Sequence, residues 1–296
     1  MKPLLFAFPN DATFAAGVVR HLHADVGRLE QHEFPDGETR IRLLDECAGR
    51  DVIVVCGGSD ANRRALPLMF AATTARELGA RTVGLVAPYL AYLRQDQRFQ
   101  AGEALSAAVY ARFISGVFDW LVTVDPHLHR LRSLGEVFSI PATAVSSAPA
   151  LAPWILAHVQ DPLIVGPDQE SEQWVTGLAA RVGAPSIVLG KVRAGDRDVR
   201  VALPDPQQVA GRSPVIVDDI ASSGRTLARA CEALLGAGAR RVDCFVVHAL
   251  FAEDAEAVAR DAGARRIVST NTIAHPTNAV DVTPRVAEAI RSYLGA

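Results

Sequence analysis

The chain carries, from Val215 to Leu227, the stretch Val-Ile-Val-Asp-Asp-Ile-Ala-Ser-Ser-Gly-Arg-Thr-Leu. Its first three residues are apolar and predict the end of a buried strand, so that Asp218 and Asp219 lie where this strand leaves its sheet. The apolar pattern that begins at Leu227 predicts a helix directly after a hydroxyl-rich turn. The stretch therefore predicts two carboxylates that face a ligand between a strand and a helix.

The turn between this strand and this helix offers groups that suit a sugar phosphate. Ser222, Ser223 and Thr226 carry hydroxyls. Gly224 lets a ligand approach the backbone closely, and the free N–H groups of a helix start attract phosphate. The two aspartates can accept hydrogen bonds from vicinal ribose hydroxyls. The alternative is a solvated Asp pair before a Ser-capped helix.

Strand-like apolar runs alternate with Ala-rich amphipathic segments along the whole chain, which predicts an α/β fold with mostly parallel sheets. The phrase Gly-Ala-Arg follows a strand, loop and helix twice, at Gly79 and at Gly238, and a strand follows each time. This repetition predicts two similar domains, although common βαβ units can produce so short a phrase by chance. The expected strands are 52–56, 82–86, 215–217 and 242–247, and the expected helices are 66–78, 227–235 and 286–294.

The domain boundary is expected between Pro141 and Pro153, a segment rich in Pro, Ala and Ser. We therefore predict two similar α/β domains, residues 1–145 and 146–296. Each is expected to be a mostly parallel sheet flanked by helices.

Composition excludes several classes of protein. The net charge is −3 and the pI is near 6.2, so no global field would attract nucleic acid or anionic lipid. The four cysteines show no zinc-site spacing, which indicates buried reduced thiols and a cytoplasmic location. The first residues are too briefly apolar for a signal peptide, and no run is long enough to span a membrane.

Two further segments suit a nucleotide. The loop motif Phe34-Pro-Asp-Gly-Glu38 presents an aromatic ring for stacking on a purine and carboxylates that accept from an amine; alone, it is equally an acidic turn with a packed Phe. The segment from Pro88 to Phe99 follows a predicted strand and includes Arg94 and Gln95, at a place where open α/β sheets bind ligands. A charged surface turn is the alternative there.

Three strand ends carry possible metal or phosphate ligands. Asp125, His127 and His129 alternate after an apolar run and would share one side if the segment stays extended; a lone His is usually structural. Asp168 follows another apolar run and could bind Mg²⁺ or cap a helix. Lys191 and Arg193 open a polar stretch, 194–198, which could close over a reaction centre.

Taken in this order, these segments resemble the ribose-phosphate diphosphokinases, also called phosphoribosyl pyrophosphate (PRPP) synthetases, over nearly the whole chain. The Gly102-Glu103 segment and the compact length resemble the archaeal-type branch. Six family motifs carry the resemblance: F-x-D-G-E at Phe34 to Glu38, P-Y-x-x-Y-x-R-Q-D at Pro88 to Asp96, D-x-H at Asp125 to His127, P-D at Pro167 and Asp168, K-x-R at Lys191 to Arg193, and D-D-I-x-[ST]-[ST]-G-x-T at Asp218 to Thr226.

The resemblance implies that both domains, residues 1–145 and 146–296, are phosphoribosyltransferase-like. It further implies a homo-oligomer that binds ATP between subunits and ribose 5-phosphate in the second domain, with Mg²⁺ as cofactor. It also implies the role of each matching residue. Adenine would be bound by Phe34, Asp36, Gly37 and Glu38 of a neighbouring subunit, ATP by Arg94 and Gln95, Mg²⁺ by His127 and Asp168, the diphosphoryl group by Lys191 and Arg193, the ribose hydroxyls by Asp218 and Asp219, and the 5-phosphate by Ser222, Ser223, Gly224, Arg225 and Thr226, with Arg193 also serving the ribose 5-phosphate.

The implied reaction is transfer of the β,γ-diphosphoryl group of ATP to the C1 hydroxyl of ribose 5-phosphate, giving PRPP and AMP. A phosphoribosyltransferase that consumes PRPP is an alternative, but it leaves the first 150 residues unexplained. A non-catalytic regulatory homologue is a third possibility, which loss of Lys191 or Arg193 would have favoured. Arg225, Gln97 and the segment Gln169-Glu170-Ser171 depart from the common family pattern, which bears on substrate preference and rate.

Overall fold

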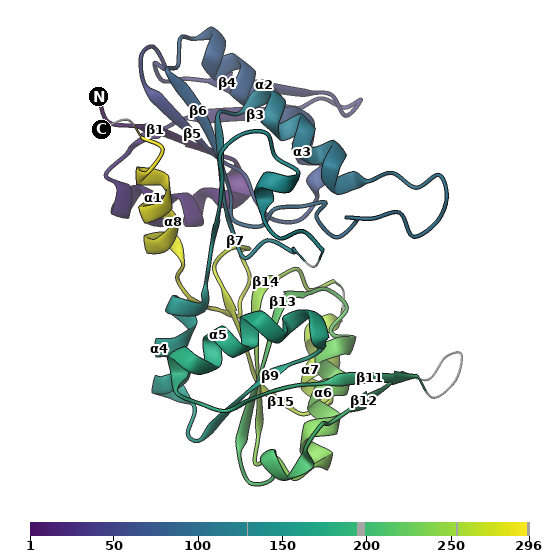
Figure 1. The fold of residues 1–296 in the computed structure, drawn as a ribbon. Helices are drawn as coiled ribbons and strands as arrows, with labels where there is room; N and C mark the ends of the chain where they lie inside the picture. Colours follow the sequence, from purple (N-terminus) through teal and green to yellow (C-terminus); the bar gives the residue numbers. More distant parts are fainter. Residues whose placement is uncertain (129, 194–198, 253, 295–296) are drawn as a thin grey trace. The chain divides into compact units, whose positions relative to one another are not determined.

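The computed structural model describes residues 1–128, 130–193, 199–252 and 254–294, and these form two compact units (Figure 1). The first unit contains Met1–Val145, Thr272–Ala274 and Val282–Ala296. The second unit contains Ser146–Asn271 and His275–Asp281. Each unit has its own sheet and its own apolar core.

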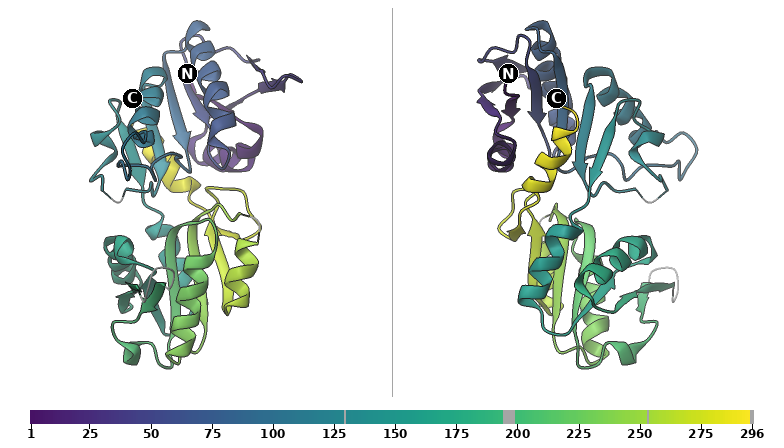
Figure 2. Two further views of the ribbon diagram at one scale, coloured as in Figure 1. Left: turned by 90° about the vertical axis from the view of Figure 1, so that its right-hand side faces the viewer. Right: turned by 60° about the vertical axis from the view of Figure 1, so that its left-hand side comes forward.

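The first unit is built on a six-stranded parallel sheet in the order β2-β1-β5-β6-β7-β8. A separate antiparallel hairpin, β3–β4, projects from this unit (Figure 2). The strands are β1 (Leu4–Ala7), β2 (Asp25–Gly27), β3 (Leu29–Glu33), β4 (Thr39–Leu43), β5 (Asp51–Val55), β6 (Thr82–Ala87), β7 (Trp120–Val124) and β8 (Ala142–Val145), and the helices are α1 (Ala12–Leu22), α2 (Ala61–Glu77), α3 (Ser106–Val117) and α8 (Thr283–Arg291).

The second unit repeats this plan, with a parallel sheet in the order β10-β9-β13-β14-β15-β16 and a separate hairpin, β11–β12. The strands are β9 (Pro162–Gly166), β10 (Ser186–Val188), β11 (Gly190–Arg193), β12 (Val199–Ala202), β13 (Ser213–Ala221), β14 (Val242–Ala249), β15 (Ala264–Thr270) and β16 (Asn278–Val280), and the helices are α4 (Ala148–His158), α5 (Glu172–Val182), α6 (Arg225–Gly236) and α7 (Ala255–Asp261).

The repeated Gly-Ala-Arg phrase ends α2 and α6 in the same way. Gly79 has φ +82° and Gly238 has φ +86°, a left-handed conformation that glycine adopts without steric cost. The N–H of Ala80 donates to the carbonyl of Ala75 at 3.0 Å, and that of Ala239 donates to Leu234 at 3.1 Å. The shared strand order and these matching helix ends confirm the predicted α/β fold of two similar units.

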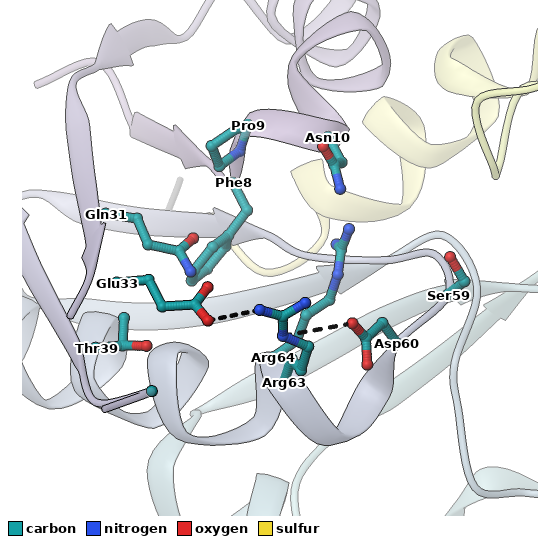
Figure 3. A pocket seen from close by; sticks show the side chains of 11 residues that line it. Phe8, Pro9, Asn10, Gln31, Glu33, Thr39, Ser59, Asp60, Arg63 and Arg64 are labelled. Carbon is teal, nitrogen blue, oxygen red and sulfur yellow. Dashed lines mark hydrogen bonds and ion pairs between the residues drawn. The ribbon is translucent and has the colours of Figure 1, made fainter. Parts of the chain in front are cut away.

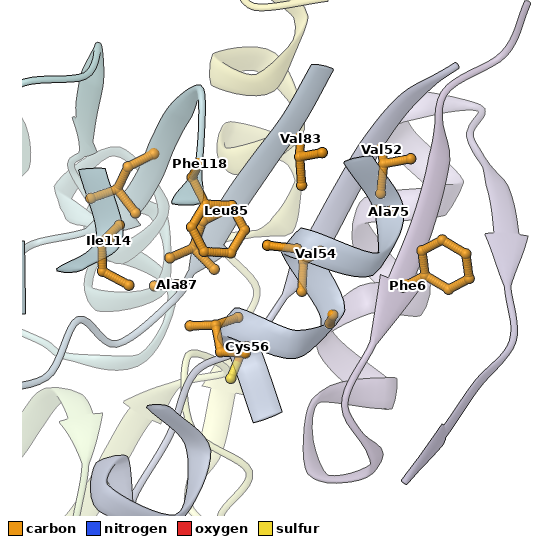
Figure 4. Close-up of a cluster of buried hydrophobic side chains, with 14 of the residues drawn as sticks. Phe6, Val52, Val54, Cys56, Ala75, Val83, Leu85, Ala87, Ile114 and Phe118 are labelled. Carbon is orange, nitrogen blue, oxygen red and sulfur yellow. The ribbon is translucent and has the colours of Figure 1, made fainter. Parts of the chain in front are cut away.

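The central strands are buried on both faces, as a parallel sheet between helices requires. In the first unit, Val52 and Val54 of β5 and Leu85 of β6 pack toward α2 and α3 (Figure 4). Small residues such as Ala75 on α2 and Ala111 on α3 are fully buried, which lets these helices approach the sheet closely. No helix of the part that the structure describes is both long and apolar enough to cross a membrane.

The terminal helix α8 packs on α1 in the first unit, whereas the predicted division assigned all of 146–296 to the second domain. Gly17 of α1 makes room for Thr283 at the start of α8. Beyond the helix, Tyr293 stacks on Trp120 with ring centres 5.0 Å apart and donates to, or accepts from, the hydroxyl of Thr143 at 2.5 Å. The chain therefore returns to its first unit at its end.

One local prediction was wrong in extent. Strand β13 continues to Ala221 instead of ending at Val217, because Asp218 and Ile220 still pair with β14. The two units divide between Val145 and Ser146, within the predicted boundary segment 141–153, and this segment contains β8 and the start of α4. Pro149 is tolerated there because the first turn of a helix does not need its backbone N–H.

The close approach of α1 and α8 gives a stability prediction for Gly17→Ala. Alanine normally favours a helix over glycine by about 1 kcal/mol. A Cβ at Gly17 would lie only 2.6 Å from Oγ1 of Thr283, so we expect the midpoint of thermal unfolding to fall. Gly177→Ala in α5 is the matched control: nothing lies within 4 Å of its Cβ, and we expect the midpoint to rise. A rise in the midpoint of thermal unfolding for both variants would contradict tight packing of α1 against α8.

Candidate active site

The predicted phosphate-binding turn lies between β13 and α6 in the second unit. Helix α6 begins at Arg225, so the N–H groups of its first turn are at the turn that sequence analysis selected. Ser222 is half-buried, and Ser223 and Thr226 are exposed, so a ligand can reach their hydroxyls. Hydroxyls, backbone N–H groups and the positive end of a helix together suit a phosphate monoester.

Gly224 is required by the geometry of this turn. Its φ is +68°, and a Cβ there would lie 2.1 Å from the carbonyl oxygen of Ala255 at the start of α7. The turn is also tied to this region by the N–H of Ala252, which donates to the carbonyl of Ser222 at 2.9 Å. The start of α7 therefore fixes the shape of the turn from behind.

Three carboxylates gather at the carboxyl ends of β9 and β13, which are neighbours in the sheet. Asp218 is half-buried. Burial raises the pKa of Asp218 well above its ordinary value, and the charges of Asp219 and Asp168 raise it further. The charges of Asp219 and Asp168 disfavour the charged form of Asp218, so a cation or hydroxyl donors bound at this edge would stabilise that form.

Carboxylate oxygens are suitable ligands for Mg²⁺. Among the residues that the structure describes, no three His, Cys, Asp or Glu side chains are already arranged around a single metal position. Asp168 precedes a short 3-10 turn, Gln169–Ser171, and its side chain makes no capping hydrogen bond there. The donor chemistry of Asp168, Asp218 and Asp219 thus fits a divalent ion that also binds a ligand.

The hairpin that carries Lys191 and Arg193 begins beside this carboxylate edge. The N–H of Leu189 donates to the carbonyl of Gly166, at the end of β9, at 2.8 Å. Lys191 is paired with Val201, and Arg193 with Val199, in the β11–β12 ladder. The predicted mobile stretch 194–198 lies outside the described residues.

In the first unit, the turn of the β3–β4 hairpin carries the predicted adenine-binding residues. Phe34 and Glu38 close the turn, because the N–H of Phe34 donates to the carbonyl of Glu38 at 2.8 Å. Asp36 accepts from the N–H of Glu38 at 3.1 Å, and Gly37 has φ +89°. The ring of Phe34 is 40% exposed and contacts His32 edge-on, so its free face is available to a base.

The remaining predicted residues of the first unit lie at the carboxyl ends of β6 and β7. Arg94 is exposed on the loop after β6, and Gln95 beside it is half-buried. The segment after β7 does not stay extended, because Asp125 has φ +31°, so the condition under which Asp125, His127 and His129 would share one side is not met. His127 lies in this turning segment, and His129 lies outside the described residues.

A pocket of about 400 Å³ in the first unit was not predicted (Figure 3). Arg63 pairs with Glu33 at 2.6 Å across it. Arg64 pairs with Asp11 at 2.7 Å, and burial raises the pKa of Asp11 despite this pair. An Arg-Arg dipeptide in a helix gives no sequence signal of such contacts. The lining residues are Phe8, Pro9, Asn10, Gln31, Glu33, Gly37, Thr39, Ser59, Asp60, Arg63 and Arg64.

Comparison with known proteins covers both units. A family model described as the N-terminal domain of ribose phosphate pyrophosphokinase matches residues 4–117, and a phosphoribosyl transferase domain model matches residues 143–285. The fold is similar to the crystal structure of phosphoribosylpyrophosphate synthetase from Mycobacterium smegmatis, with a TM-score of 0.88, 23% identity and 99% of each chain covered.

Curated relatives are similar over almost their full length. The ribose-phosphate pyrophosphokinase of Methanopyrus kandleri is 32% identical over 280 residues, which cover 94% of this chain and 95% of that protein. The enzyme of the same name from Halobacterium salinarum is 32% identical over 290 residues, covering 97% and 100%. The chain therefore belongs to the ribose-phosphate pyrophosphokinase family.

Proposed function

We propose that this chain transfers the β,γ-diphosphoryl group of ATP to the C1 hydroxyl of ribose 5-phosphate. The C1 oxygen attacks the β-phosphorus in line, the bond from the β-phosphorus to the α,β-bridging oxygen breaks, and the hydroxyl proton is released. The products are PRPP and AMP. The observation that carries the proposal is a hydroxyl-rich turn before α6, with Asp218 and Asp219 near the end of β13, in a chain of this family whose first unit matches the N-terminal domain model.

Each group of residues has a distinct task in this proposal. Asp218 and Asp219 accept hydrogen bonds from the ribose hydroxyls, while the start of α6 and the hydroxyls of residues 222, 223 and 226 hold the 5-phosphate. Lys191 and Arg193 act on the negative charge of the transferring group. Little covalent chemistry is left for the protein, so catalysis rests on positioning and charge neutralisation.

Mg²⁺ is the proposed cofactor, and when bound it would neutralise phosphate oxygens of ATP. His127 and Asp168 are the ligands proposed from the family pattern, and the carboxylates beside Asp168 suit the same ion. We propose a cytoplasmic location as well. All four cysteines are buried and free, which accords with a reducing compartment.

Product analysis tests the proposed reaction. Pure protein with ATP, Mg²⁺ and ribose 5-phosphate is expected to form AMP and PRPP in equal amounts. Lys191→Ala is expected to lower kcat by at least about a hundredfold while binding changes far less, because its charge matters most in the transition state. ADP as the product would refute the proposal, and a requirement for PRPP and a base would indicate the phosphoribosyltransferase alternative.

Asp218→Asn tests the carboxylate edge by two independent measurements. We expect the KM for ribose 5-phosphate to rise about tenfold, since a neutral amide is a weaker acceptor for sugar hydroxyls. We expect the midpoint of thermal unfolding without ligands to rise, because one of three repelling carboxylates is removed. Asp243→Asn is the matched control, since Asp243 is buried and paired with Arg266 at 2.7 Å, and this substitution should lower the midpoint. An unchanged KM would place the sugar elsewhere.

We further propose an oligomer in which Phe34, Asp36 and Glu38 of one subunit complete the ATP site of another. Complementation tests this arrangement: Phe34→Ala and Arg94→Ala are each expected to be nearly inactive. After subunit exchange, mixed oligomers should regain activity, because some interfaces then combine an intact Phe34 with an intact Arg94. Each variant exchanged with itself is the control. No recovery despite proven exchange would place the whole site within one chain.

A further inference from the structure

The loop between β6 and α3 is organised around the carboxylate of Glu103. One oxygen, Oε2, accepts from the backbone N–H of Phe99 at 2.7 Å and from that of Gln100 at 3.1 Å. The same oxygen accepts from Nε2 of Gln95 at 3.1 Å. Three donors therefore converge on one carboxylate oxygen, and one of them is the side chain next to the exposed Arg94.

These contacts fix the orientation of the Gln95 amide. Its Nε2 also donates to the carbonyl of Gln97 at 3.2 Å. Both neighbours, a carboxylate and a carbonyl, can only accept hydrogen bonds, so the nitrogen of the amide must face them. The amide oxygen, Oε1, therefore lies on the other side of the planar group, where it can only act as an acceptor.

The backbone of Gln95 is held as firmly as its side chain. Its carbonyl accepts from the N–H of Ala107, in the first turn of α3, at 3.3 Å. The next residue, Asp96, has a side chain that is only 3% exposed and that pairs with Arg130 at 2.9 Å. Before it, Leu93 is buried in the core of the first unit. Glu103 thus acts on the side chain of a residue whose backbone is already held in place.

We propose that Glu103 is a positioning residue for the nucleotide: it orients Gln95 so that Oε1 accepts a hydrogen bond from a donor group of ATP. This inference rests on the proposed function, which makes Gln95 an ATP-binding residue. The donor is the exocyclic amine of adenine or a ribose hydroxyl, since both offer the same chemistry to an amide oxygen. Glu103 itself does not touch the nucleotide in this arrangement.

The charge and chemistry of the carboxylate explain why a glutamine at 103 would not serve as well. A carboxylate is an acceptor only, and it therefore rejects the flipped amide, in which Oε1 of Gln95 would face it. A glutamine at 103 has a neutral oxygen, which is a weaker acceptor, and it also carries a donor, so it holds Gln95 less firmly, although the carbonyl of Gln97 still favours the observed orientation. Glu103→Gln is consequently expected to keep the size of the side chain and weaken the fixed orientation of its partner.

The first measurement is ATP binding to the full chain, by calorimetry in the presence of Mg²⁺. We expect Glu103→Gln to raise the Kd for ATP by up to about tenfold, the effect of losing the neutral hydrogen bond between ATP and Oε1 of Gln95, and to leave the Kd for ribose 5-phosphate unchanged. Asp119→Asn is the matched control. Asp119 also accepts from a backbone N–H, that of Val83, at 2.7 Å and from Arg76 at 2.8 Å, but it lies at the amino ends of β6 and β7. Asp119→Asn should lower the stability of the fold without changing the Kd for ATP.

The second measurement separates orientation from loop stability. Gln95→Ala should weaken ATP binding, and adding Glu103→Gln to it should weaken binding no further, within about twofold, because Glu103 acts through Gln95. If the two substitutions together weaken ATP binding by the product of their separate effects, the inference is overturned. So would normal ATP binding by Glu103→Gln while Gln95→Ala is impaired, an outcome that leaves the proposed function intact. No effect of Gln95→Ala would instead remove the ATP role of Gln95 and this inference with it.

The third measurement uses three analogues that each lack one donor: purine riboside 5′-triphosphate, 2′-deoxy-ATP and 3′-deoxy-ATP. The native chain should bind one of them more weakly than ATP by about tenfold, and that analogue identifies the donor. Glu103→Gln should lose part of this discrimination, because its less firmly held Gln95 presents the acceptor less consistently. Full discrimination by Glu103→Gln would show that the amide is oriented without Glu103 and would overturn the inference.

Discussion

The parallel pairing of β1 with β5, and of β9 with β13, is the constraint on which both units depend. In each sheet, the first strand of the pair connects to a strand on one side and the second to a strand on the other. Open α/β sheets bind ligands at the carboxyl ends of such a pair, because the two connections diverge there and leave a crevice. Since both faces of these strands are buried, polar side chains can gather only at the strand ends.

The two units use these equivalent crevices differently. In the second unit, the strand ends lead to Asp168 and Asp218 and to a turn with accessible hydroxyls. In the first unit, the guanidinium of Arg64 lies between the carboxylate of Asp11 and the carbonyl of Gly57, and the N–H of Gly57 donates to Asp11 at 3.2 Å. A side chain of the protein thus pairs with the carboxylate in this unit, whereas Asp218 has carboxylate neighbours. The two units therefore share a strand order but differ in the polar groups at these strand ends.

The strand, turn and helix around Asp218 could be predicted because their signals are local: apolar runs mark buried strands, and Gly, Ser and Asp mark their ends. The position of α8 could not be predicted in this way. Its amphipathic pattern indicates a buried face, but not that the partner is α1, far away in the sequence. The turn at Asp125 depends on a positive φ that no neighbouring glycine announces. The contacts of Glu103 could not be predicted from the sequence, because two of the three groups that donate to its carboxylate are backbone N–H groups.

The cause of a carboxyl group's pKa shift separates structural from ligand-binding carboxylates in this protein. Burial raises the pKa of Asp11, but Arg64 opposes the rise and satisfies the charge within the fold. Burial also raises the pKa of Asp218, and there the neighbouring charges are carboxylates that add to the rise. A fold gains no stability from gathering like charges, so such a cluster persists where a bound group compensates it. By this argument the edge beside Asp218 suits a cation and a sugar better than the crevice beside Asp11 does.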